Sequence, residues 1–130
     1  MALALETAGH AALLQRDPHH ATADYGDALR LFQAMGDRAG TTVCLEGLAA
    51  VAVQQNQPER AAWLSGAAAG LRAALGAPQP PVDRALYAPL LATVRVALGE
   101  DAFAAAWEAG RALLLEQAMT VALTAPEPRS

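Results

Sequence analysis

The chain contains an internal duplication, and this feature limits the possible folds more than any other. The segment from Leu5 to Gly36 aligns without a gap with the segment from Leu45 to Gly76, which gives a period of 40 residues. The identical pairs include prolines, glutamates, glutamines and glycines, which an alanine-rich composition does not explain. They are Leu5/Leu45, Glu6/Glu46, Ala12/Ala52, Gln15/Gln55, Pro18/Pro58, Ala21/Ala61, Gly26/Gly66, Ala28/Ala68, Leu31/Leu71, Ala34/Ala74 and Gly36/Gly76. Such a period indicates stacked copies of one supersecondary unit.

Each copy is expected to form two helices joined by a polar turn. Alanine and leucine, the commonest residues, are strong helix formers, and β-branched residues are few. The first helices are predicted over about 2–15 and 41–55, and the second helices over about 18–35 and 58–75. The chain is therefore predicted to be all-α.

Prolines and glycines indicate where these helices begin and end. Pro18 and Pro58 suit the first turn of a helix, where the missing N–H needs no partner. Gly36 and Gly76 suit the left-handed position just after a helix. The residues 36–41 are predicted to be a linker, with Thr41 or Thr42 as the cap of the following helix.

The second half of the chain departs from the repeat. A proline-rich connector is predicted over 77–81, because closely spaced prolines do not fit a helix interior. Further helices are predicted over about 82–98, 101–112 and 114–123, which makes about seven in total, and the tail 125–130 is expected to fray. The expected organisation is a single domain over 1–130. It comprises repeat 1 (about 2–37), repeat 2 (about 41–77) and a divergent C-terminal capping unit (82–124).

The spacing of small and large residues in each copy resembles the tetratricopeptide repeat. The residues at the signature positions are Leu5, Ala8, Gly9, Ala12, Ala21, Tyr25 and Ala28, and in the second copy Leu45, Leu48, Ala49, Ala52, Ala61, Ser65 and Ala68. The long unit is similar to those of MalT-like regulators and related bacterial ATPase regulators of the LuxR type, as are the stretches 25–37, 45–49, 98–103 and 106–113. The resemblance implies a right-handed stack of antiparallel helical hairpins, an α-solenoid. It also implies the C-terminal docking or sensing region of a bacterial transcriptional regulator.

Charge and composition argue against several classes of partner. The net charge is −4, lysine is absent and the nine arginines are dispersed, so no direct nucleic-acid contact is expected. No segment reads as a membrane span or as a leader peptide. The single cysteine, Cys44, cannot form an internal disulfide, which suits a cytoplasmic protein; a disulfide-free secreted domain is the alternative.

No constellation in the sequence predicts an enzyme, a metal site or a cofactor. His19 and His20 lie near Asp17 and Asp24, but a metal site needs three or four converging ligands, and a solvated polar turn is the alternative. The acid pairs Asp24/Asp27 and Glu100/Asp101 are expected near helix ends or on exposed faces. Ser65 is not in a nucleophile elbow, and Cys44 is expected to be buried and inert.

A concave groove is the candidate binding surface that the resemblance implies. Its inward-facing positions are Glu6, His10, Leu14, Glu46, Ala50 and Gln54. The two glutamates could receive a basic peptide or an amine; alternatively, they are solvated residues in the first turns of their helices. Trp63 either packs under the third unit, against Trp107, or is an exposed interface anchor.

The first helix carries much apolar surface and no helix precedes it. Leu3 is the candidate anchor on this surface, and either a homodimer through this end or a missing N-terminal portion is expected. The favoured function is a non-enzymatic protein-interaction module with a protein or peptide partner. The alternatives are a small-molecule effector sensor that uses the groove and a small helical enzyme.

Overall fold

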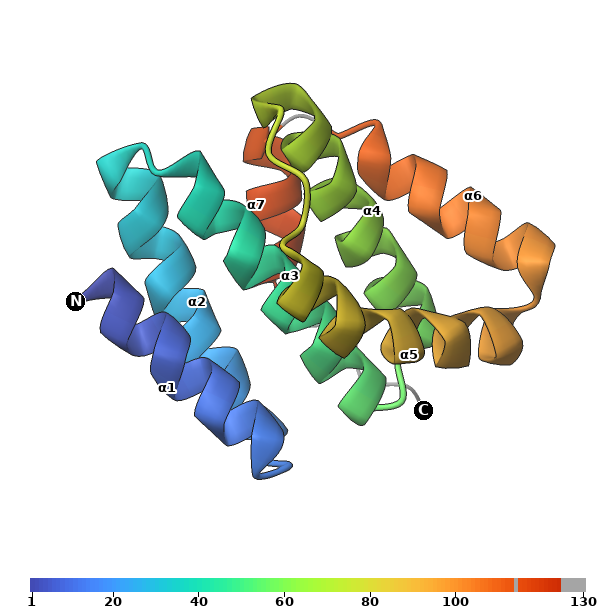
Figure 1. Ribbon diagram of the computed structural model, residues 1–130, viewed down its shortest axis with the longest axis horizontal. Helices are drawn as coiled ribbons and strands as arrows, with labels where there is room; N and C mark the ends of the chain where they lie inside the picture. The colour runs from blue at the N-terminus through green and yellow to red at the C-terminus, as the bar shows by residue number, and fades with distance from the viewer. Residues whose placement is uncertain (114, 125–130) are drawn as a thin grey trace.

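The computed structural model describes residues 1–113 and 115–124, and within them it is all-helical, without strands. Figure 1 shows the seven α-helices of this described part. They are α1 (Ala2–Leu14), α2 (Pro18–Met35), α3 (Arg38–Gln54), α4 (Pro58–Leu75), α5 (Pro81–Leu98), α6 (Glu100–Arg111) and α7 (Leu115–Leu123). Six of the predicted helices agree with these bounds to within one residue. The expected frayed tail, 125–130, lies outside the described residues.

The helix ends of the two copies are built alike. Pro18 and Pro58 occupy the first turns of α2 and α4, and Gly36 and Gly76 end these helices with left-handed φ values of 70° and 64°. The polar turns before the prolines also match, because Arg16 and Asn56 both have positive φ, at 56° and 59°. The expectation for α2 and α4 is confirmed at these ends.

The prediction for the start of α3 is wrong by three residues. Asp37 is the N-cap, and its carboxylate accepts a hydrogen bond from the backbone N–H of Gly40 at 2.9 Å. Residues 38–40 are therefore helical and are no linker. Thr41 and Thr42 are not caps, since their hydroxyls donate to the carbonyls of Asp37 and Arg38 one turn earlier.

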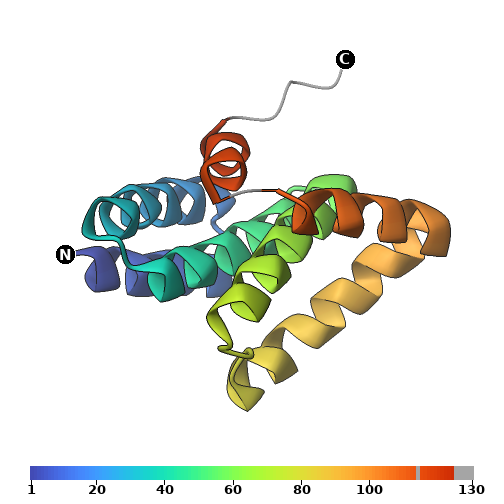
Figure 2. The same cartoon turned by 90° about the horizontal axis from the view of Figure 1, so that it is seen from above.

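Helices α1 to α4 lie side by side in chain order, each packed on the next (Figure 1). Helix α6 packs along α4, and α5 contacts α3, α4 and α6. Helix α7 contacts α2 and α4 and lies on the other side of the first four helices from α5 (Figure 2). Arg60 of α4 holds the end of α7, because its guanidinium donates to the carbonyls of Val121, Ala122 and Thr124. Helix α1 also contacts α3, and α5 and α7 lie on opposite sides of the first four helices (Figure 2).

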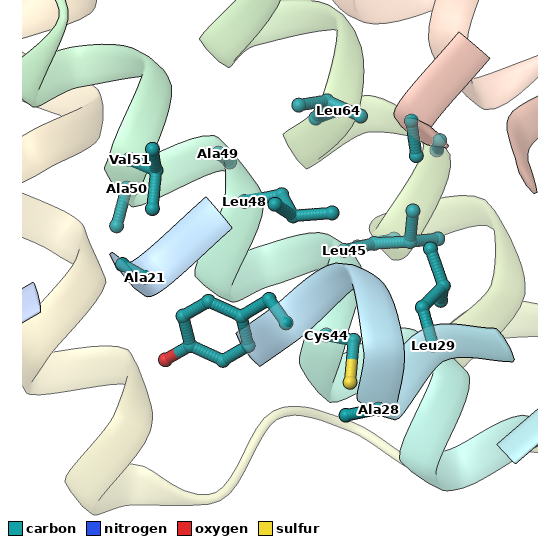
Figure 3. Close-up of a cluster of buried hydrophobic side chains, with 14 of the residues drawn as sticks. Ala21, Ala28, Leu29, Cys44, Leu45, Leu48, Ala49, Ala50, Val51 and Leu64 are labelled. Atoms are coloured by element: carbon teal, nitrogen blue, oxygen red, sulfur yellow. The ribbon is translucent and has the colours of Figure 1, made fainter. Parts of the chain in front are cut away.

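The main hydrophobic core is built mostly from α2, α3 and α4, with further residues from α1 and α7, and Figure 3 shows Leu29 beside Leu45 within it. Close approaches between helices depend on small residues. A Cβ atom at Gly47 would overlap the ring of Tyr25, and one at Gly66 would overlap the carbonyl oxygen of Trp107. These glycines therefore set the spacing of α2 against α3 and of α4 against α6.

No helix in the described part of the chain is both long enough and apolar enough to cross a membrane.

Candidate functional site

A cavity of about 460 Å³ lies between α3, α4 and α5, with one residue of α6 at its edge. Most of its lining is apolar. The lining residues are Glu46, Ala49, Ala50, Val53, Ala61, Ser65, Ala69, Arg72, Ala73, Gly76, Ala77, Pro78, Gln79, Tyr87, Leu90, Leu91, Val94 and Trp107. Small side chains on α3 and α4 leave this space open, because alanines stand where larger residues would reach α5.

One end of the cavity holds a buried ion pair. Arg72 of α4 donates from Nε and Nη2 to the two carboxylate oxygens of Glu46 on α3, at 2.8 Å and 2.6 Å. The two side chains are only 13% and 10% exposed. Such a two-point pair fixes both side chains, because the planar guanidinium matches the carboxylate. The hydrogen bonds to Glu46 raise the pKa of Arg72, and burial opposes this shift without reversing it.

The proline-rich connector closes this polar end. The Gln79 side-chain amide donates to the carboxylate of Glu46 at 2.9 Å, and Arg72 Nη1 donates to the carbonyl of Ala77 at 3.2 Å. Helix α5 begins at Pro81, with Pro80 as its N-cap, so Pro81 belongs to the helix and the expected connector is one residue shorter. The segment between α4 and α5 is thereby tied to the ion pair.

Tyr87 of α5 adds a hydroxyl group near the ion pair. Burial raises the pKa of Tyr87 above its usual value, and the negative charges of Glu46, Asp83 and Glu6 raise it further. The phenol therefore stays protonated at neutral pH. Its hydroxyl makes no hydrogen bond within residues 1–113 and 115–124, so it can donate to or accept from a ligand.

The other end of the cavity is apolar and continues into a second, smaller core cluster. Val53, Ala61, Leu91 and Val94 line this end, together with Trp107 of α6. The Trp107 ring lies 5.7 Å from the ring of Phe103, centroid to centroid. The cavity thus has a polar end near Arg72 and an apolar end near Trp107.

Two of the six groove residues expected from the sequence line the cavity. Glu46 and Ala50 line the cavity, whereas Gln54 donates to the carbonyl of Leu13 at 2.7 Å and joins α3 to α1. Glu6 and His10 are half-buried on α1, and Leu14 is exposed. The expectation that Glu46 is a solvated first-turn glutamate is wrong, because it lies in the third turn of α3 and is buried against Arg72.

The two expected interface anchors differ in exposure. Leu3 is 68% exposed on α1. Trp63 is half-buried and packs against the main core, and its carbonyl lies against Gly110 of α6. The backbone of Trp63 thus packs against α6 and its side chain against the main core, and the aromatic ring beside Trp107 is that of Phe103.

The remaining polar candidates have local structural roles. Asp17 caps α2, and the hydrogen bond from the backbone N–H of His20 is the main cause that lowers the pKa of this carboxyl. Glu100 and Asp101 stand in the first turn of α6, as expected. Cys44 is buried, as predicted, and burial raises its pKa to about 12. Within the described residues no group of three or more His, Cys, Asp or Glu side chains could hold a metal ion.

Sequence reasoning missed Arg72, Gln79 and Tyr87. One signal could have indicated the first of them. The repeat aligns Arg72 with the buried Phe32, so a charged residue stands where the other copy has a core residue. A buried arginine usually requires an acidic partner. Gln79 and Tyr87 lie beyond the duplication, and no comparable signal marks them.

Comparison with protein-family models, with curated proteins and with solved structures found no match to this chain.

Proposed function

We propose that this chain is a non-enzymatic binding module that holds a small effector molecule in the cavity between α3, α4 and α5. The lining of the cavity supports this most strongly, because Glu46 and Arg72 form a paired polar end on a mainly apolar wall. Ligand-binding cavities typically measure about 300–1,000 Å³ and combine apolar walls with a few placed polar groups. The cavity here has this size and this composition.

A catalytic function has less support. The cavity offers Ser65 as a nucleophile, but within the described residues its hydroxyl has no hydrogen bond to a base. The acid in the cavity, Glu46, is already neutralised by Arg72. An acid or base held in a salt bridge of this kind is poorly suited to proton transfer.

We also propose that α1–α2 and α3–α4 are successive units of a right-handed tetratricopeptide-like stack, within the sensing region of a cytoplasmic bacterial regulator. The repeated turn geometry supports this, since Arg16 and Asn56 share a left-handed conformation, as do Gly36 and Gly76. In such a region, a ligand bound between α3, α4 and α5 would bias the position of α5 relative to the first four helices.

A fluorescent dye tests binding in the cavity. The uncharged dye N-phenyl-1-naphthylamine brightens in apolar surroundings and is expected to brighten with this protein. Ala69→Phe places a ring in the cavity and should abolish the signal, while the melting temperature stays close to that of the parent. Ala104→Phe, at an exposed position on α6 outside the lining, is the matched control and should keep the signal. Equal signals from both variants would overturn the proposal.

Protein docking through α1 is a second candidate function. Leu3 and Leu14 are 68% and 65% exposed, and their spacing of about three helical turns places them on one face. We expect concentration-dependent dimers in sedimentation experiments. Leu3→Asp should remove the dimers, and Val96→Asp, at an exposed apolar site on α5, should not. A monomer at all concentrations would contradict self-association through α1.

A further inference from the structure

We infer that the cavity selects an uncharged, elongated molecule with an apolar body and one hydrogen-bonding end group. This inference rests on the proposed binding function and names the class of ligand. Three features of the cavity carry it: the neutrality of its polar end, the hydrogen-bonding groups left free there, and its length.

The polar end is neutral overall because the charges of Glu46 and Arg72 are paired with each other. The Glu46 carboxylate accepts three hydrogen bonds, two from Arg72 and one from Gln79. A charged ligand group would have to leave water and would find no unpaired counter-charge among the lining residues. An uncharged group loses much less on the same transfer.

The surroundings of the pair also disfavour a charged ligand. Glu6 and Asp83 act on Tyr87 with negative charge at this end, so an anion entering the cavity meets repulsion. Both acids lie outside the lining, so they act on a bound group from farther away than the lining residue Arg72 does. A cation inside the cavity would instead lie against the positive charge of Arg72. Neither sign of charge is favoured there.

Hydrogen-bonding capacity nevertheless remains at this end. Arg72 uses three of its five N–H groups, two on Glu46 and one on the carbonyl of Ala77. Its other two N–H groups and the Tyr87 hydroxyl have no partner within the described residues. A hydroxyl, carbonyl or amide group of a ligand can accept from Arg72 and also exchange a hydrogen bond with Tyr87.

The length of the lining calls for an elongated body. Glu46 and Val53 of α3 are two turns apart, about 10 Å along the axis at 1.5 Å per residue. On α4 the lining extends from Arg72 back to Ala61, about 16 Å by the same measure. A ligand with its polar group at Arg72 therefore reaches the apolar end beside Trp107 with its body.

Displacement of bound N-phenyl-1-naphthylamine by three molecules with the same chain tests this inference. Decan-1-ol, decanoate and decylammonium, used at concentrations where each is monomeric, share a ten-carbon skeleton and carry a neutral, a negative and a positive end group. We expect decan-1-ol to displace half of the dye at a concentration at least tenfold lower than either ion. Equal or stronger displacement by an ion would overturn the inference while leaving cavity binding intact. If the dye does not bind at all, the proposed function fails and the inference fails with it.

Removal of one charge of the pair should change the selection in a defined direction. Glu46→Gln leaves Arg72 uncompensated, so decanoate should gain at least tenfold relative to decan-1-ol in the folded variant. Glu59→Gln removes an exposed acid from the first turn of α4 and should leave the order unchanged. An unchanged order in folded Glu46→Gln would contradict the role assigned to the pair. The order measured on the parent protein decides the inference even where this variant unfolds.

Discussion

Substitution of two aligned glycines by alanine is expected to change the stability of the fold in opposite directions. Gly26 and Gly66 hold equivalent positions of the duplication, in α2 and α4. A Cβ at Gly26 would meet Arg30 Nη1 at 3.7 Å and Leu123 Cδ2 at 3.8 Å, which are ordinary contacts. A Cβ at Gly66 would instead overlap the backbone of Trp107, far inside the 3.0 Å that real Cβ atoms respect. The two substitutions are chemically identical and differ only in what the added methyl group meets.

The magnitudes follow from two effects. Alanine in place of glycine within a helix favours folding by about 1 kcal/mol. At Gly66 this gain is opposed by overpacking against a rigid backbone, which costs about 3 kcal/mol because α6 must move away from α4. Gly66→Ala should therefore lose about 2 kcal/mol net, and Gly26→Ala should gain about 1 kcal/mol.

Thermal and urea unfolding followed by circular dichroism measures both effects. At about 4 °C per kcal/mol for a chain of this size, we expect the melting temperature to fall by about 8 °C for Gly66→Ala and to rise by about 4 °C for Gly26→Ala. A shift of the same sign in both variants would refute the assigned packing of α4 against α6.

Three further predictions concern the charged and titratable groups. Glu46→Ala should lower the free energy of unfolding by about 3 kcal/mol in urea, because it leaves Arg72 buried without its partner. Asp27→Ala removes the partner of Arg30 in an exposed pair and should change the free energy of unfolding by less than about 1 kcal/mol. A similar loss in both would contradict the buried pair. Because the pKa of Asp17 is lowered in the folded state, its cap should stabilise the protein above about pH 4 and lose this effect as the pH falls through the lowered pKa. Asp17→Ala should therefore reduce the slope of melting temperature against pH in that range, and an unchanged slope would count against the cap. Cys44, with its pKa raised to about 12 by burial, should react with a thiol reagent at pH 8 only on unfolding, and rapid reaction of the native protein would argue against this burial.

The sequence allowed the helices to be placed because local signals mark their ends. Pro18, Pro58, Gly36 and Gly76 act within one turn of the chain, so they can be interpreted without knowledge of packing. The start of α3 was misplaced because Gly40 resembles a linker residue, whereas the Asp37 cap extends the helix through it. Asp37 is itself a local capping signal, but the cap was predicted at Thr41 or Thr42.

The candidate site was predicted only in part, for a physical reason. Glu46 and Ala50 were predicted because the resemblance to the tetratricopeptide repeat implies that they face inward, and both line the cavity. Their partners depend on how α5 crosses α3 and α4, and that crossing is set by contacts between residues far apart in sequence. Gln79 reaches Glu46 only because the connector folds back over the ion pair. No periodicity within α5 encodes that path.

The most direct test of the central claim is a nuclear magnetic resonance titration that compares the two tryptophans. Trp107 lines the cavity, whereas Trp63 packs against the main core outside it. On addition of decan-1-ol to nitrogen-labelled protein, we expect the indole N–H signal of Trp107 to shift with saturation and that of Trp63 to stay in place. No shift in either signal, or a shift of Trp63 alone, would contradict binding in this cavity.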